Sequence, residues 1–522
     1  MRSIAAGVAL GVALAIPVIQ AQQAPDLKKV LYNAADALGM LRGAQEVDRI
    51  ATIRYWASGT APMSGQPAPV TGYAASVNFH VPGMRVDVTR TNGSPQRLVE
   101  VVSDKWAWNE TQPGMNATPA AAAANARQLQ IWMLPQGVVK AATAAGAATK
   151  VSTAGGVTTL AFPIASVGAD VKATLDAKYF IREVEARIGG AVYTATYSDY
   201  GDWNGADYLS DVMFPKRIVQ KRDGVTLLDL TVSKTNTYNP YVVMPVPENI
   251  APASAAQTAA AQIPGGRGAG PAAAQNVPTP RTPDGHPDLN GFWAAGGGGG
   301  RAAGESPFDE QGNLRLAGNY RKNNPINGER DSGIGQRFGP NFPLYKPQHW
   351  DKVDYLDING NVTDSNFHCM PAGVPRMGPP LRIVQTAKDV VFLYREKNMY
   401  RLIPTDGRPH DPINSNDQTF LGDSIGHWEG DTFVVDVVGF NEESWLGWPG
   451  YFHTNKLRVT ERLTRQGNTL RYQATADDPD VLMKPWVMDM RVLQLNVNPF
   501  TQIEDPPCIE SDGANMVTKE RG

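Results

Sequence analysis

The sequence predicts a mainly β protein with two antiparallel β domains: an N-terminal half-barrel with helices and a C-terminal meander barrel or sandwich. Three observations in the 522 residues support this fold class. Alternating apolar and polar segments, separated by turn residues, fill most of the chain up to residue 247. A second such series follows Pro380. Between the two, residues 248–280 are nearly all Ala, Pro, Gly and Gln, a composition that buries too little apolar surface to fold.

Residues 1–24 are typical of a secretory signal peptide. Arg2 precedes an apolar run from Ile4 to Ile19, and the small Ala21 is a suitable cleavage site. No Cys follows this run, which argues against a lipid anchor, and no later segment is long and apolar enough to cross a bilayer. We therefore expect a protein that is periplasmic or secreted.

Residues 25–247 are expected to form the first β domain. Residues 26–41 place their apolar side chains on one helical face, so a helix opens the domain. Four segments with strand character follow it. Residues 119–146 then interrupt the series with two helical segments on either side of Pro135, after which a long strand meander resumes.

The meander reads YFIREVEARIGGAVYTATYSDYGDWNGADYLSDVMFPKRIVQKRDGVTLLDLTVSKTNTYNP. Its strand, its Y-x-D-Y-x-x-x-x-G element, its FP pair and its long final strand resemble the half-barrel of the periplasmic lipoprotein carriers. The resemblance covers roughly residues 26–247 and implies a concave apolar face that holds acyl chains. The alternative is that a curved sheet over helices is simply a stable domain.

Residues 248–305, including the GGGGG run at 296–300, are expected to be a disordered linker, and residues 306–522 a C-terminal antiparallel β domain. The segments TPDGHPDLNGFW, CMPAGVPR, TDGR, WEGDTFVVDVVGFN and DDPDVLMKPW occur between residues 279 and 510. This pattern resembles a family of exported bacterial proteins of uncharacterised function, and the resemblance implies no activity.

The C-terminal strands are joined by short turns, which predicts a barrel or a sandwich. In WEGDT, Gly430 supplies the backbone angle of a hairpin turn. In LRVTERLTR, Glu461 shares a face with aliphatic residues and should point inward. Asp436 lies in a strand that is apolar on both faces, so its direction is ambiguous. An inward carboxylate is expected to be either half of a buried ion pair, for example with Arg401, or part of an acid–base site.

Two long loops of this domain carry polar and aromatic groups that could meet a ligand. In NEESWLGWPGYFHTNK, exposed aromatic side chains would be costly unless they cover something, either the domain itself or a flat apolar ligand. TDGRPHDPINSNDQT is the other long loop and could lie at the same mouth of the barrel. The catalytic candidates are Glu461, Asp436, His410 and His453. The ligand-binding candidates are Asp406, Arg408, Asn441, Trp445 and Trp448.

Charge and cysteine content restrict the partners. The formal net charge is −3 and no basic block is present, so a nucleic-acid partner is not expected. The histidines show no metal-ligand spacing, so no metal site is predicted, and the sequence implies no particular cofactor. In an oxidising compartment Cys369 and Cys508 would form a disulfide; two buried thiols are the alternative.

Two functions remain open from the sequence, and a third possibility is a surface or assembly protein whose filled barrels hold no small ligand. The first is an exported protein that binds a lipophilic or aromatic small molecule in a β-barrel cavity. The second is a lyase, isomerase or hydrolase that uses carboxylate and His acid–base chemistry in the C-terminal domain. A carboxylate near a His and open to a cavity would favour the enzyme, and a carboxylate sealed against Arg401 would favour the binding protein. The sequence does not specify an oligomeric state.

Overall fold

The computed structural model describes residues 25–42, 47–48, 50–63, 66–203, 212–237, 239, 241–251, 277–295, 341–413, 416–447, 450–498, 501, 503–505 and 508. Two large antiparallel sheets, one in each half of the chain, dominate these residues, which confirms the mainly β fold class. The predicted signal peptide and Trp448 lie outside the described residues.

The N-terminal sheet has 13 strands in the order β8-β7-β6-β5-β4-β3-β15-β14-β13-β12-β11-β10-β9. The strands are β3 (Thr52–Met63), β4 (Gln66–Asn78), β5 (Gly83–Thr89), β6 (Arg97–Ser103), β7 (Trp106–Glu110), β8 (Thr118–Pro119), β9 (Lys150–Ala154), β10 (Val157–Ile164), β11 (Ala169–Leu175), β12 (Ile181–Ile188), β13 (Ala191–Asp202), β14 (Met213–Arg222) and β15 (Val225–Thr237). A separate pair consists of β1 (Leu41–Arg42) and β2 (Val47–Asp48). The pairing of β15 with β3 joins the first and last strands of the meander.

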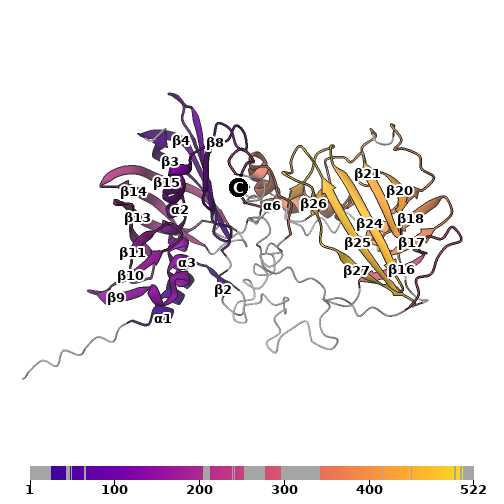
Figure 1. The fold of residues 1–522 in the computed structure, drawn as a ribbon, viewed down its shortest axis with the longest axis horizontal. Coiled ribbons are helices and arrows are strands. Elements are labelled where there is room, and N and C mark those ends of the chain that lie inside the picture. The colour runs from indigo at the N-terminus through magenta and orange to yellow at the C-terminus, as the bar shows by residue number, and fades with distance from the viewer. Residues whose placement is uncertain are drawn as a thin grey trace, which may run out of the picture.

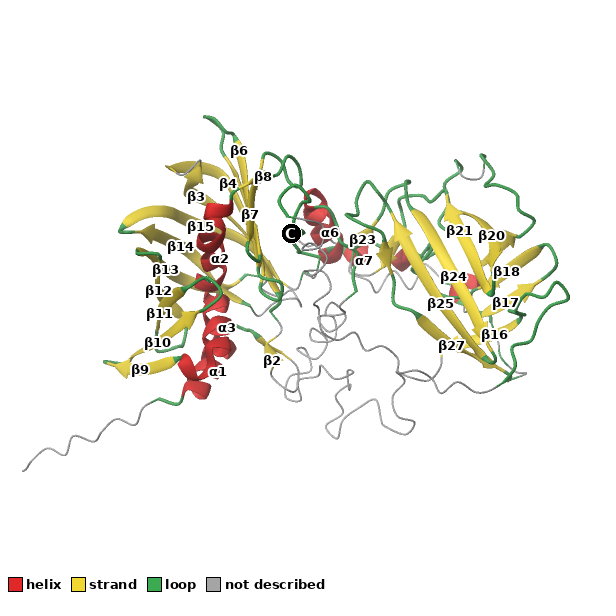
Figure 2. Ribbon diagram, viewed as in Figure 1, coloured by secondary structure: helices red, strands yellow, loops and turns green. Residues whose placement is uncertain are grey.

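Three helices cover one face of this sheet: α1 (Leu27–Ala37), α2 (Ala124–Met133) and α3 (Pro135–Ala145) (Figure 2). Their apolar side chains share one core cluster with the strands. Pro135 opens α3 because a proline lacks the N–H that a helix interior needs, and this confirms the predicted break between two helices. The hydroxyl of Tyr197 in β13 donates to the carbonyl oxygen of Met133 at 2.7 Å and ties the sheet to this break. One face of the sheet is therefore packed with helices.

The C-terminal sheet has ten strands, nine of them in the order β19-β18-β17-β16-β27-β25-β24-β21-β20, with β26 paired to β25. The strands are β16 (Gly291–Ala295), β17 (Arg382–Gln385), β18 (Asp389–Leu393), β19 (Tyr400–Pro404), β20 (Asp423–Glu429), β21 (Thr432–Val438), β24 (Arg458–Gln466), β25 (Thr469–Asp477), β26 (Trp486–Val487) and β27 (Arg491–Asn496). The short strands β22 (Trp445–Gly447) and β23 (Tyr451–Phe452) pair separately.

This sheet curls into a nearly closed barrel. Its end strands approach each other, since Arg401 of β19 donates to the hydroxyl of Ser424 in β20 at 2.9 Å. The predicted hairpin is present: β20 and β21 pair across Gly430, which has a φ of 59°. The predicted linker of residues 248–305 contains β16, which pairs with β17 and β27 in the middle of the sheet.

Between the two sheets lie α6 (Trp350–Ile358) and the short α7 (Gly360–Thr363) (Figure 2). Single 3₁₀ turns occur at η1 (Ala121–Ala123), η2 (Gly146–Ala148), η3 (Pro347–His349), η4 (Ser365–His368) and η5 (Glu396–Asn398). Cys369 and Cys508 form the predicted disulfide across a sequence separation of 139 residues. Among the described residues, no helix combines the length and the apolar character that a membrane crossing requires.

Candidate functional site

Helix α6 is packed against the N-terminal sheet by an apolar core that continues into the C-terminal half. Trp350 and Val353 of α6 are buried in the same cluster as Val99 and Trp108, which lie in β6 and β7. Tyr345, just before the helix, belongs to this cluster too. Because one core includes residues of both halves, the position of α6 relative to the sheet is set by packing.

A buried polar contact fixes the same helix. Arg54 of β3 is 5% exposed, and its guanidinium donates to the carboxylates of Asp354 and of Asp351, the latter at 2.6 Å. The hydroxyl of Tyr241 donates to the other oxygen of Asp354, and Ser76 accepts from Nε of Arg54 at 3.1 Å. A buried carboxylate and guanidinium are costly unless they are paired, so these contacts favour one placement of α6.

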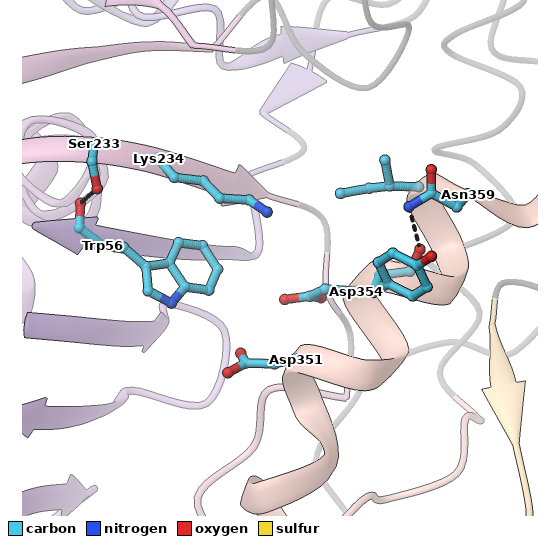
Figure 3. A pocket seen from close by; sticks show the side chains of 8 residues that line it. Trp56, Ser233, Lys234, Asp351, Asp354 and Asn359 are labelled. Atoms are coloured by element: carbon cyan, nitrogen blue, oxygen red, sulfur yellow. Dashed lines mark hydrogen bonds between the residues drawn. The ribbon is translucent and has the colours of Figure 1, made fainter. Parts of the chain in front are cut away.

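Beside this contact, the sheet and α6 border a cavity of about 350 Å³ that is partly open to solvent (Figure 3). Trp56 of β3 and Lys234 of β15 form the wall on the sheet side, and α6 with the residue after it forms the other. The ammonium nitrogen of Lys234 lies 5.5 Å from the centre of the Trp56 ring system. The lining residues are Trp56, Ser233, Lys234, Asp351, Asp354, Tyr355, Ile358 and Asn359.

The two carboxylates of this cavity differ in environment. Burial raises the pKa of Asp354 from 3.8 to about 6, and the neighbouring Arg54 offsets only part of that shift. Asp351 keeps 74% of its side chain exposed while one of its oxygens accepts from Arg54. The cavity therefore combines an apolar ring, one buried acid, one exposed acid and an ammonium group.

None of these lining residues was a site candidate from the sequence. Trp56 and Lys234 lie in segments expected to be ordinary strands. A signal was nevertheless present in HWDKVDYLDIN, because Trp350, Val353, Asp354 and Asp357 have the i, i+3, i+4, i+7 spacing of one helical face. Two carboxylates on the apolar face of a helix indicate buried polar contacts or a site.

Glu461, the predicted inward carboxylate, lies inside the C-terminal barrel and is fully buried. Its Oε2 lies 2.7 Å from Nη2 of Arg401, and its Oε1 accepts from the hydroxyl of Tyr472 at 2.8 Å. Arg401 also donates to the hydroxyl of Tyr394 at 3.0 Å. This geometry is the buried ion pair that the sequence offered as the alternative to an acid–base role.

Asp436 and His410 are brought together on the outer face of the barrel. Oδ2 of Asp436 lies 3.2 Å from Nε2 of His410, while Nδ1 of His410 lies 2.7 Å from Oδ2 of Asp423. Arg458 donates to Asp436 at 2.7 Å. Burial tends to raise the pKa of Asp436, but the bonds from Arg458 and His410 outweigh it and leave that pKa below its ordinary value. Both ring nitrogens of His410 thus face carboxylates.

His453 is separate from this group and is 1% exposed. Its Nδ1 lies 2.9 Å from the carbonyl oxygen of Thr454, which can only accept, so Nδ1 carries the proton. Nε2 then accepts from the hydroxyl of Ser444 at 2.9 Å. Burial lowers the pKa of His453 and favours its neutral form. Ser444 and Trp445 are buried as well, so this part of the aromatic loop packs against the domain itself.

The remaining ligand-binding candidates lie near the surface. Arg408 pairs with Asp406 at 2.6 Å, and both are exposed. Oδ1 of Asn441 accepts from the backbone of Glu443 at 3.4 Å. In the part of the chain that the structure describes, no group of three or more His, Cys, Asp or Glu side chains is placed to hold a metal ion.

The chain matches no protein-family profile, and a search of curated proteins also finds no match.

The Arg401–Glu461 pair generates a stability prediction. Glu461→Gln leaves the buried guanidinium without its counter-charge, so the free energy of unfolding should fall by about 3–5 kcal/mol. Replacing both partners, Arg401→Met with Glu461→Leu, should recover most of that loss. Urea unfolding measures both effects. The exposed Glu429, which pairs with Arg462 at 2.7 Å, provides the control: Glu429→Gln should cost less than about 1 kcal/mol. Equal losses of unfolding free energy in Glu461→Gln and Glu429→Gln would contradict a special role for burial of the pair.

Asp354 generates a pH prediction. Its folded-state pKa of about 6 exceeds its unfolded value of 3.8, so the folded chain takes up the proton first. The contribution of this group to the unfolding free energy therefore grows as pH falls from about 6 towards 4, by at most about 3 kcal/mol. Asp354→Asn does not titrate, so the stability difference between wild type and variant should change in that window. A difference that stays constant between pH 7 and pH 4 would contradict the shift.

Proposed function

We propose that this chain is an exported protein that binds a small molecule in the cavity between its two β units. The ligand has a flat apolar face, which covers the ring of Trp56, and a polar edge, which meets Asp351 and Lys234. Export to the periplasm or beyond is supported by the character of residues 1–24 and by the disulfide between Cys369 and Cys508.

The cavity itself is the observation that carries this proposal. Small-molecule sites are concave, are often found between domains, and combine apolar side chains with a few polar groups. The volume of about 350 Å³ lies at the lower end of the range of about 300–1,000 Å³ that such sites span. A compact ligand suits this volume better than a long acyl chain.

A ligand site inside a β-barrel, as expected from the sequence, has less support than the interdomain cavity. Arg401 and Glu461 occupy the interior of the C-terminal barrel, and α1, α2 and α3 cover one face of the N-terminal sheet. A lipophilic cargo of the kind that the carrier resemblance implies would need those helices to move away. The interdomain cavity needs no such rearrangement.

Acid–base catalysis is the second candidate, because Asp436 lies 3.2 Å from His410. In this role Asp436 would orient His410, and His410 would transfer the proton. Since Nδ1 of His410 also faces Asp423, the imidazole would have to leave one carboxylate before it could reach a substrate. The arrangement of two carboxylates around one imidazole equally suits a fixed loop contact, so binding in the interdomain cavity remains the first proposal.

Trp56→Ala tests the proposed function. Native mass spectrometry of the purified protein should detect a small molecule that is released on denaturation, and the variant should retain at most about a tenth of it, a difference of about 1.4 kcal/mol. Trp203→Ala is the matched control, because Trp203 also lies beside a lysine, Lys216, at 5.7 Å but contributes nothing to the cavity lining. Equal ligand occupancy in the two variants, or no ligand in any of the proteins, would contradict the proposal.

A further inference from the structure

We propose that the ligand of this cavity is a small zwitterion of the amino-acid type, with one anionic group, one cationic group and an apolar or aromatic body. This inference rests on the proposed binding function and adds the chemical class of the ligand. It follows from how charge is distributed over the two walls.

The two walls carry opposite charges. Lys234 extends from β15 on the sheet side, and Asp351 and Asp354 extend towards it from α6 (Figure 3). Lys234 and both aspartates line the same cavity, and the positive charge of Lys234 tends to lower the pKa of Asp354. A ligand between the walls therefore meets a cation on one side and carboxylates on the other.

The buried carboxylate already has its partners. Asp354 accepts from both Arg54 and Tyr241, so its two oxygens are satisfied within the protein. One oxygen of Asp351 accepts a hydrogen bond from Arg54, and 74% of the side chain is exposed. On the opposite wall Lys234 is exposed too. Asp351, an anion, and Lys234, a cation, are thus the two groups best placed to change partners when a ligand enters.

The charged residues of the lining are the carboxylates of Asp351 and Asp354 and the ammonium of Lys234, and Arg54, which pairs with both carboxylates from outside the lining, supplies the second cation. A ligand with net charge would leave one of these groups unbalanced in a partly desolvated space, which costs free energy. A zwitterion satisfies both walls without adding net charge, with its anion towards Lys234 and its cation towards Asp351. A neutral ligand would use neither charge.

The rest of the lining fits the body of such a ligand. Trp56 and Ile358 are half-buried, so part of each apolar side chain faces the cavity and would gain from being covered. The volume of about 350 Å³ accommodates a compact body rather than a long chain. An amino acid with an apolar side chain has both the charge pattern and the size.

Three compounds of one shape test the inference on the full-length mature protein by isothermal titration calorimetry. L-phenylalanine carries both charges, phenethylamine lacks the carboxylate, and 3-phenylpropionate lacks the amine. Phenylalanine should bind at least ten times more tightly than either analogue. Asp351→Asn should remove the preference over 3-phenylpropionate, and Lys234→Met should remove the preference over phenethylamine. Both positions are exposed, so the fold should tolerate these changes, and Lys216→Met is the matched lysine control.

The contrary outcomes separate the inference from the proposed function. If the three compounds bind equally, or if the preferences survive both substitutions, the zwitterion inference is overturned while small-molecule binding stands. The zwitterion inference is also overturned, and small-molecule binding stands, if a ligand co-purifies with the wild type but not with Trp56→Ala and that ligand lacks the anionic or the cationic group. If none of the compounds binds and no ligand co-purifies, both the inference and the proposed function are overturned.

Discussion

The contact of Arg54 with Asp354 and Tyr241 is the constraint on which the arrangement of the two halves depends. It joins strand β3, helix α6 and the segment after β15, and all three side chains are buried. Removing a guanidinium and a carboxylate from water costs several kcal/mol for each ion, and only close pairing with further hydrogen bonds compensates that cost. Small displacements of α6 would therefore lose much of the compensation. The cavity exists because this helix is held at one distance from Trp56 and Lys234.

Apolar packing acts together with this contact. Trp350, at the start of α6, lies near two guanidinium groups of the N-terminal sheet, Arg54 at 5.7 Å and Arg85 at 5.8 Å from its ring centre. Arg85 is itself held by two hydrogen bonds to Glu110, at 2.7 and 2.9 Å. The indole of Trp108 donates to the same carboxylate at 2.7 Å. Paired charges are thus buried around one aromatic ring. The contact between the two halves is part of the same core. A ligand site at this position would be preorganised in its backbone, because packing sets the place of α6 relative to the sheet.

Features that depend on neighbouring residues in the chain could be predicted from the sequence. The strands, the break at Pro135, the turn at Gly430 and the inward direction of Glu461 all follow from alternation or from backbone restrictions. Residues distant in sequence were harder to place. The ion pair of Glu461 with Arg401 could be offered only as one of two alternatives. Neither the position of β16 in the middle of the C-terminal sheet nor the cavity beside Trp56 was predicted, because both depend on contacts between segments that no local pattern relates.

Hydrogen–deuterium exchange in Arg54→Met measures whether this buried contact holds α6 in place. Methionine keeps much of the apolar stem but cannot pair with Asp354 or Asp351. The account predicts that the backbone amides of Trp350–Ile358 exchange at least about tenfold faster than in the wild type, while those of β20 and β21 are unchanged. Unchanged protection of α6 would contradict the account, because apolar packing alone would then be sufficient to position the helix and shape the cavity.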